Sequence, residues 1–553
     1  MERVTVDLSD LAEPVHGGAS GMLYGLSEEG VPTRALLEGA APRTVAQKPP
    51  GGAQHPGGDA LEVAGSFFAC GGQELLVYLQ DALEQWPYED VGVEALCDIA
   101  RTAVAAVADH PDARRFTWVP FNEGDWIWYA DWSPAGRDGF LADWDAVVAA
   151  IRSVDPGARV AGPNEARYQP VRVRDFLAHA RDAGTLPDVM SWHELQPSCL
   201  ETFPAHLAHY RALERELGVG PLPVNVDEYG NKRDTSVPSR LLAWFDLLET
   251  AKVDGDLAYW TAAGNLDDHT AGTSANSGWW LLHWYASLRG RTAAVRVPHP
   301  GVRDSLRALA AHDADGATAT VLVGGGARAV DLEVCGLDGA AGLAGHDRLR
   351  VRTWAVSWSG YEGELLAPDV LGDEVHAVEP TGAAGSGGVL RLRLPVTDAT
   401  AVVRVDVSPD GGGAPAPTSS WSALVPVDDA LVVGCPTRRH GDDAQEHAGT
   451  GRRGVSGTPS ADSSVEFPVT VPADGEHVLS LGYGTDSAPA RLALSVDGGP
   501  VRVVELPPTL SRTYTGRCAV VVPLSAGPHR VRWSTRDAEG GHLPDSDVAV
   551  DHL

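Results

Sequence analysis

The chain has few lysines and no long apolar run. Only three of its 43 basic residues are lysines, and the formal net charge is −32 at pH 7. A surface this acidic repels phosphate backbones and anionic lipids, which argues against nucleic acids and membranes as partners. No segment approaches the roughly 18–20 consecutive apolar residues that span a bilayer. The 553 residues are enough for two to four domains with a sizeable core.

Cysteine is also scarce. The six cysteines are scattered and include no C-x-x-C pair, which argues against zinc ribbons and a dense disulfide framework. One pair, such as Cys435 with Cys518 in the last segment, could be bridged if the protein is secreted. The N-terminus lacks a basic region followed by an apolar stretch, so it shows no signal peptide. We therefore expect a cytoplasmic protein, or a secreted one whose leader is absent from this sequence.

Residues 20–290 alternate short apolar runs with stretches of helical periodicity. The apolar runs begin near residues 21, 43, 75, 116, 159, 188, 223 and 256. The spacing of apolar residues predicts helices over 93–108, 140–154, 173–183, 204–217 and 239–252, with a last one near 278–288. Eight strands alternating with helices are typical of a (β/α)8 barrel.

The character of the sequence changes after the barrel. Residues 291–408 alternate apolar and polar positions with a period of two, which predicts a β-sandwich. We expect the N-terminal strand in 1–19 to pair with it. A linker rich in proline, glycine and serine follows at 409–420, and 421–553 predict a second sandwich. The predicted fold class is α/β, with a barrel followed by two all-β sandwich domains.

Two of the predicted strands end in glutamate. Glu123, preceded by Asn122, ends the fourth strand, and Glu228 ends the seventh. Residues that carry out chemistry in this fold lie at the C-terminal ends of the strands. Glycoside hydrolysis needs two carboxyl groups beside the anomeric carbon, one protonated and one ionised. Aromatic residues follow Glu123, including Trp126, and indole rings suit the CH faces of sugars. The pattern therefore predicts a glycosidase.

The segments 121–123 and 227–229 resemble the acid/base and nucleophile signatures of clan A retaining glycoside hydrolases. Over residues 1–408 the chain most resembles glycoside hydrolase family 39, with some likeness to family 51. The resemblance implies that Glu123 is the general acid/base and Glu228 the nucleophile. It also implies that no cofactor is needed and that the partner is a carbohydrate.

The same resemblance implies roles for residues around the pair. Asn122 would bond the sugar 2-hydroxyl, His193 would support the nucleophile and the sugar, and Trp260 would form the floor of the −1 subsite. Two positions depart from the family pattern. Gly124 stands where proline is usual, and Tyr229 replaces the commoner tryptophan or phenylalanine. The departures leave the sugar open among a xylosidase-like, an arabinosidase-like and a uronic-acid-releasing activity. A non-catalytic carbohydrate-binding protein is a further alternative.

Other residues at the same end of the barrel are candidates for binding substrate. They are Gln80, His55, Asp59, Trp126 and Tyr229. Glu165 forms a second Asn-Glu pair with Asn164, and is either an alternative acid or, more simply, a subsite residue or helix cap. Glu194 should point away from the pocket if His193 points in, because neighbours alternate along a strand. We expect no metal site in the barrel.

The last segment, 421–553, resembles carbohydrate-binding modules of families 35 and 6. Such modules are β-sandwiches that often hold a structural calcium ion. Trp421 opens the segment where those modules usually begin with Glu-Ala-Glu. The resemblance implies a sugar-binding domain, with a purely structural sandwich as the alternative.

Overall fold

The computed structural model describes residues 2–27, 31–55, 57–258, 266, 269–271, 274–326, 329–360, 364–380, 388–395, 398–411, 423–439, 453–485, 490–506, 512 and 516–553. The chain divides into two compact units. The first holds a barrel and a ten-stranded sheet, and the second holds the C-terminal sandwich together with 268–280 and 354–372.

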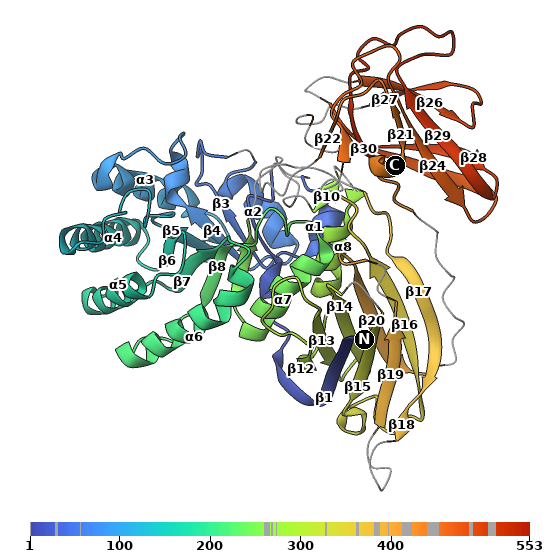
Figure 1. Cartoon of the computed structure of the whole chain (residues 1–553). Coiled ribbons are helices and arrows are strands. Elements are labelled where there is room, and N and C mark those ends of the chain that lie inside the picture. The colour runs from blue at the N-terminus through green and yellow to red at the C-terminus, as the bar shows by residue number, and fades with distance from the viewer. Residues whose placement is uncertain are drawn as a thin grey trace. The chain divides into compact units, whose positions relative to one another are not determined.

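Eight parallel strands close the barrel, so the predicted (β/α)8 architecture is confirmed (Figure 1). Every predicted barrel strand forms. The strands are β2 (Gly21–Leu23), β3 (Thr44–Gln47), β4 (Glu74–Tyr78), β5 (Phe116–Val119), β6 (Arg159–Glu165), β7 (Val189–Glu194), β8 (Val224–Tyr229) and β9 (Asp254–Leu257). Several, such as β5 and β8, are buried at every position, as expected of parallel strands covered on both faces.

Helices cover the outside of the barrel (Figure 1). They are α1 (Arg34–Ala40), α2 (Ala60–Ala69), α3 (Gly92–Val107), α4 (Pro134–Val154), α5 (Pro170–Ala183), α6 (Cys199–Leu217), α7 (Pro238–Ala251) and α8 (Ser277–Ala286). Helix α4 begins six residues before the predicted start at 140. Ser133 caps it and Pro134 takes its first turn, whereas the apolar periodicity begins only at Phe140. Gly184 and Gly218 end α5 and α6 in the left-handed conformation that glycine favours.

The segment predicted as the first sandwich forms one continuous sheet with the N-terminal strand. Strand β1 (Glu2–Pro14) pairs antiparallel with β12 and parallel with β15, near the middle of the sheet. Ser239 of α7 donates to the backbone oxygens of Ala399 and Thr400, which ties the barrel to this sheet. The other strands are β12 (Arg291–Arg296), β13 (Arg307–Asp313), β14 (Thr318–Gly324), β15 (Val330–Cys335), β16 (Arg348–Val356), β17 (Asp369–Ala377), β18 (Glu379–Pro380), β19 (Gly388–Leu394) and β20 (Val402–Pro409).

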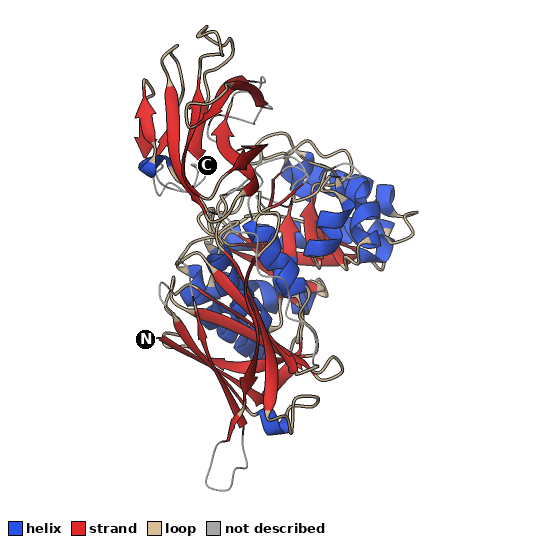
Figure 2. Ribbon diagram, turned by 90° about the vertical axis from the view of Figure 1, so that its right-hand side faces the viewer, coloured by secondary structure: helices blue, strands red, loops and turns tan. Residues whose placement is uncertain are grey.

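The C-terminal sandwich contains two five-stranded sheets (Figure 2). One sheet has the order β21-β24-β29-β26-β27 and the other β22-β23-β30-β25-β28. Phe467, Tyr483 and Trp533 are buried in their common core. The strands are β21 (Leu431–Val433), β22 (Thr437–Arg439), β23 (Arg453–Val455), β24 (Ser464–Val471), β25 (Gly475–Gly484), β26 (Ala490–Val496), β27 (Arg502–Leu506), β28 (Gly516–Leu524), β29 (Gly527–Ser534) and β30 (Ala549–His552).

The cysteines of the sandwich do not form the bridge considered from the sequence. Cys435 and Cys518 are both free thiols. Cys435 precedes β22 and Cys518 lies in β28, at opposite edges of one sheet, so the pairing order keeps them apart. Within the described residues, no helix combines the length and apolarity needed to cross a membrane.

The start of β2 is packed too closely for any side chain. A Cβ atom at Gly21 would lie 2.2 Å from Asp256 Oδ1 and 2.3 Å from Thr44 Oγ1. At Gly65, in α2, no described heavy atom beyond the neighbouring residues and the backbone of the helix itself lies within 4 Å of the same position. We therefore expect Gly21→Ala to lower the free energy of unfolding by about 1–3 kcal/mol through overpacking. Gly65→Ala should raise it by about 0.5–1 kcal/mol because alanine favours the helix.

Urea unfolding monitored by tryptophan fluorescence would measure both glycine variants against the unchanged chain. Equal midpoints for the two variants would contradict the packing described at the barrel start.

Candidate active site

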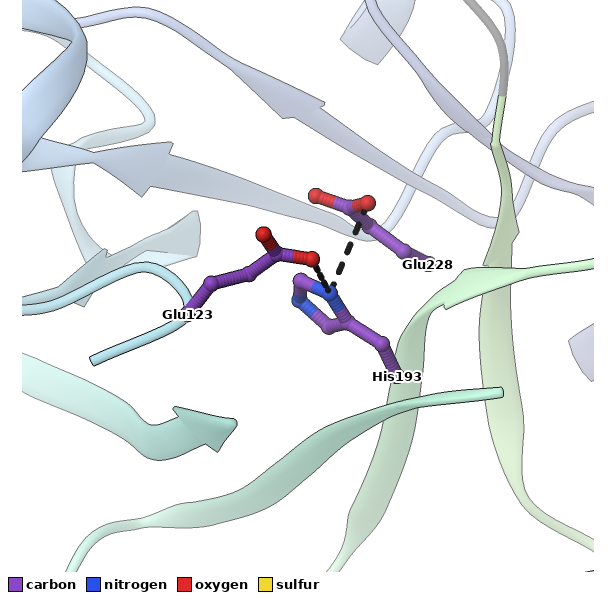
Figure 3. Close-up of side chains that lie close together, drawn as sticks. All are labelled: Glu123, His193 and Glu228. Carbon is purple, nitrogen blue, oxygen red and sulfur yellow. Dashed lines mark hydrogen bonds and ion pairs between the residues drawn. The ribbon is translucent and has the colours of Figure 1, made fainter. Parts of the chain in front are cut away.

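Three side chains from separate strand ends converge at the C-terminal mouth of the barrel (Figure 3). Glu123 follows β5, His193 lies in β7 and Glu228 in β8. His193 Nδ1 lies 3.1 Å from Glu123 Oε1 and 3.5 Å from Glu228 Oε2. All three are buried, with exposed fractions of 6%, 1% and 4% in chain order. The structure thus brings together the two glutamates and the histidine singled out from the sequence.

The separation of the carboxylates bears on the reaction type. One oxygen of Glu123 and one of Glu228 lie within 4.8 Å of each other. Retaining glycosidases place their carboxyl groups roughly 5–5.5 Å apart, whereas inverting ones leave about 6.5–9.5 Å for a water molecule. The spacing fits direct attack by one carboxylate and leaves little room for a water between them.

The backbone at Glu123 adopts an uncommon conformation. Its φ is 51°, in the left-handed region, and its N–H donates to the Asn164 carbonyl oxygen at 2.8 Å. Its own carbonyl oxygen accepts from the N–H groups of Trp126 and Ile127, which closes a turn. A proline at 124 would press its ring against the backbone of residue 123 and favour extended conformations there. Gly124 therefore permits the turn that aims Glu123 into the site.

Asn122 belongs to the wall beside Glu123. Its N–H donates to Gln80 Oε1 at 2.6 Å, and its side-chain amide donates to Tyr88 Oη at 3.2 Å. Asn164, also left-handed with φ 61°, places its amide among Asn122, Ser191 and the Asp227 carboxylate. With its nitrogen turned toward Asp227, Asn164 donates to that carboxylate and to Ser191. Gln80 and Asn122 therefore lie together, with Asn122 directly before Glu123 in the chain.

Asp81 is a buried acid that the sequence reasoning did not select. The hydroxyls of Tyr24 and Tyr88 both donate to its carboxylate. Burial raises the pKa of Asp81 to about 7, although the two hydroxyl bonds act in the opposite direction. Its charge also acts on Glu228. The feature of the sequence that could have identified Asp81 is its position directly after Gln80, at the end of a strand.

The loop after β3 contributes one of its two candidates to this region. The His55 ring stacks on Tyr24 with 4.3 Å between centroids, and burial, assisted by Lys48, lowers the pKa of His55 to about 4. Asp59 does not join the group. It caps α2 in a capping box with Glu62, so its carboxylate serves the helix rather than the site.

Two further candidates point away from the carboxylate pair. Glu165 forms a 2.5 Å ion pair with Arg172 of α5, and Tyr229 donates its hydroxyl to the Ala19 carbonyl oxygen. Glu194 likewise accepts from His206 of α6, outside the barrel. The placement of Glu165 and Tyr229 corrects their assignment as substrate-binding residues, because the alternation of a strand directs their side chains outward. Trp260 lies outside the described residues.

His193 is held as a cation. Burial alone would lower its pKa, but Glu228, Glu123 and Asp227 outweigh that effect and raise it to about 10. Burial also acts to raise the pKa of Glu123, yet the bond and charge of His193 and the Trp126 N–H lower it overall. Burial raises the pKa of Glu228, with Glu123, Asp227 and Asp81 adding to the effect. Within the coupled pair, these surroundings therefore act to place the pKa of Glu228 above that of Glu123.

The spacing of Glu123, His193 and Glu228 would also suit a metal ion. A metal ion bound there would have to displace the proton that the neighbouring acids favour on His193. The same spacing also suits proton transfer between the two carboxyl groups.

No protein-family model matches this chain. It is 32% identical to a 3-O-β-L-arabinopyranosyl-α-L-arabinofuranosidase from Bifidobacterium pseudocatenulatum, over 96% of this chain and 62% of that protein. It is 31% identical to a 3-O-α-D-galactosyl-α-L-arabinofuranosidase from Bifidobacterium longum subsp. longum, over 98% of this chain and 53% of that protein. The chain thus spans little more than half the length of these relatives. Among solved structures it resembles N2152 from Neocallimastix frontalis, with a TM-score of 0.64, 23% identity, and coverage of 74% of this chain and 100% of that one.

The charge state of His193 can be measured directly. We expect its imidazole to stay protonated from pH 7 to 9 and to titrate near the pKa of about 10 that its three acidic neighbours produce. NMR of histidine labelled with ¹³C at Cε1, with the signal assigned by His193→Asn, would follow the titration. Glu228→Gln should move it to lower pH, because it removes one of the negative charges that favour the cation. A neutral His193 at pH 7 would contradict the electrostatics described here.

Proposed function

We propose that this chain is a retaining glycoside hydrolase that cleaves α-L-arabinofuranosidic bonds in plant or microbial oligo- and polysaccharides. The supporting observation is the pair of buried carboxylates, within 4.8 Å of each other at the C-terminal mouth of the barrel. Two carboxyl groups at that separation suit a double displacement. The similarity to two arabinofuranosidases supports the choice of sugar.

Each glutamate has a separate role in the proposed reaction. A Glu228 oxygen attacks the anomeric carbon and forms a glycosyl ester, while the bond to the leaving oxygen breaks and that oxygen takes the proton of Glu123. Glu123 then removes a proton from water, the water oxygen attacks the anomeric carbon, and Glu228 is released. The hydroxyl group of the water ends on the sugar and its proton ends on Glu123, so the cycle closes without a cofactor.

The order of the two pKa values must change for the first step. The surroundings raise the pKa of Glu228 and lower that of Glu123, whereas attack requires an ionised Glu228 and a protonated Glu123. His193 holds Glu123 ionised through its Nδ1–H. A sugar that takes up this bond, or draws His193 toward Glu228, would raise the pKa of Glu123 and lower that of Glu228. We propose that substrate binding brings the two pKa values into the order that the reaction needs.

The charge of the site favours a neutral sugar over a uronic acid. The negative charges of Glu123, Asp227 and Asp81 act to raise the pKa of Glu228, whereas the His193 cation acts to lower it. A sugar carboxylate placed there would be repelled. The xylosidase alternative shares the mechanism and differs only in the sugar. The alternative of a non-catalytic binding protein would leave the spacing of the two buried carboxylates without a role.

The C-terminal sandwich enters the proposal as a carbohydrate-binding module. Its two five-stranded sheets are the architecture of the modules that its sequence resembles. Under the proposal it holds the enzyme on a polysaccharide, with or without a structural calcium ion. A supporting sandwich without sugar affinity is the alternative.

Substitutions of the carboxylates test the proposed mechanism. Glu228→Gln should lower kcat/KM on 4-nitrophenyl α-L-arabinofuranoside by at least about 10³-fold, since it removes the nucleophile. Glu123→Ala should lose about 10²–10⁴-fold on oligosaccharides, and azide should restore turnover of the aryl glycoside by giving a glycosyl azide. Glu165→Gln is the matched control. It alters the other Asn-Glu pair and should keep turnover within a few-fold.

The wild-type protein should turn over the arabinofuranoside faster than the matching β-D-xyloside or β-D-glucuronide. In methanol–water mixtures it should form the methyl α-L-arabinofuranoside, which retains the starting configuration. Near-normal turnover by Glu228→Gln, or a product of inverted configuration, would overturn the mechanism. A faster xyloside would overturn only the choice of sugar.

A further inference from the structure

Two tryptophans stand exposed at the rim beside the carboxylate pair. Trp86 is 39% exposed and Trp126 is 41% exposed. They are the only aromatic members of the exposed large hydrophobic side chains in the described part of the chain. Their rings meet edge to face at 6.0 Å, and Trp86 packs against Tyr88 at 5.0 Å. The fold therefore keeps a supported aromatic surface in contact with solvent, where a ligand can cover it.

Trp126 also reaches the catalytic pair. Its Nε1–H donates to Glu123 Oε2 at 2.7 Å, while His193 contacts the other oxygen, Oε1. The two bonds fix the orientation of the carboxyl group about its own axis. One exposed side chain thus presents its ring to solvent and its N–H to Glu123.

We propose that Trp86 and Trp126 bind the leaving-group sugar by stacking, and that Trp126 also positions Glu123 through its indole N–H. The CH groups of a pyranose face form an apolar patch that packs on an indole ring while the hydroxyls stay in water. The leaving group must lie next to Glu123, because that residue gives it a proton. This inference rests on the proposed function and specifies its leaving-group subsite.

The local sequence accounts for this arrangement. Glu123 has a left-handed backbone conformation, and its carbonyl oxygen accepts from the Trp126 backbone N–H. The resulting turn brings the Trp126 indole within hydrogen-bonding distance of the Glu123 carboxylate. Gly124 allows that turn where a proline would oppose it. Gly124, the position at which this chain departs from the families it resembles, therefore allows the turn that positions Trp126.

Three arabinofuranosides that differ only in the leaving group distinguish stacking on the tryptophans from proton donation by Glu123. The methyl glycoside needs the proton but offers no ring to stack. The 4-nitrophenyl glycoside has a good leaving group and needs little protonation. The oligosaccharide, with a pyranose as leaving group, needs both.

Trp86→Ala should raise KM for the oligosaccharide about ten-fold, equivalent to about 1.4 kcal/mol, and leave the methyl glycoside unchanged. Trp126→Phe keeps a ring but removes the N–H. It should lower kcat about ten-fold on the methyl glycoside and the oligosaccharide, and spare the 4-nitrophenyl glycoside. Trp128→Phe is the matched control, because the Trp128 N–H in the same loop donates to the Tyr88 carbonyl oxygen instead.

The pH profile gives a second measure of the Trp126 bond. The charged groups that face Glu123 are His193 of β7 and Glu228 of β8, with Asp227 beyond His193. Removing a donor from a carboxylate raises its pKa. The basic limb of kcat/KM should therefore move to higher pH in Trp126→Phe and stay in place in Trp128→Phe.

A thermal unfolding midpoint equal to that of the wild type would show that each variant is folded. Equal kinetics for Trp126→Phe and Trp128→Phe would overturn the positioning role. Equal losses on the methyl glycoside and the oligosaccharide in Trp86→Ala would overturn the stacking role. An inactive wild type would contradict the proposed function itself, and is distinguished by the same assays.

Discussion

A single protonated imidazole between two carboxylates is the interaction on which the site depends. His193 Nδ1 is 3.1 Å from Glu123 and 3.5 Å from Glu228, in a buried region that also holds Asp227 and Asp81. Without the cation, these acids could not stay so close unless most of them were protonated. The histidine therefore permits the short carboxylate separation, and it acts to lower the pKa of both glutamates beside it.

The barrel supplies the geometry that brings the three groups together. Parallel strands end at a common face, so residues more than a hundred positions apart meet at the mouth. Irregular pairing at Ser191–His193 and at Val226–Tyr229 adjusts the register where His193 and Glu228 project. The left-handed Glu123 and Asn164 are further departures at the same place. Such strained positions tend to gather where a protein places functional groups.

The sequence predicted the barrel and the pair of strand-end glutamates because both follow from local patterns. Alternating apolar runs and helices reveal strand order, and a glutamate directly after a strand lies at the mouth. The role of Tyr24 and Asp81 could not be predicted in this way. It depends on the hydroxyls of Tyr24, after β2, and Tyr88, after β4, which both donate to the Asp81 carboxylate. Glu165, Tyr229 and Asp59 were misplaced because a residue near a strand end can face outward or cap a helix, and spacing alone does not distinguish these cases.

The central claim is that Glu228 forms a covalent bond to the sugar. Incubation with a 2-deoxy-2-fluoro-arabinofuranosyl donor carrying a good leaving group should trap the glycosyl ester, because the fluorine slows its hydrolysis more than its formation. Mass spectrometry of proteolytic peptides should then find one added fluoro-sugar on Glu228. Attachment to another residue, or turnover of the donor with no adduct and an inverted product, would contradict the account.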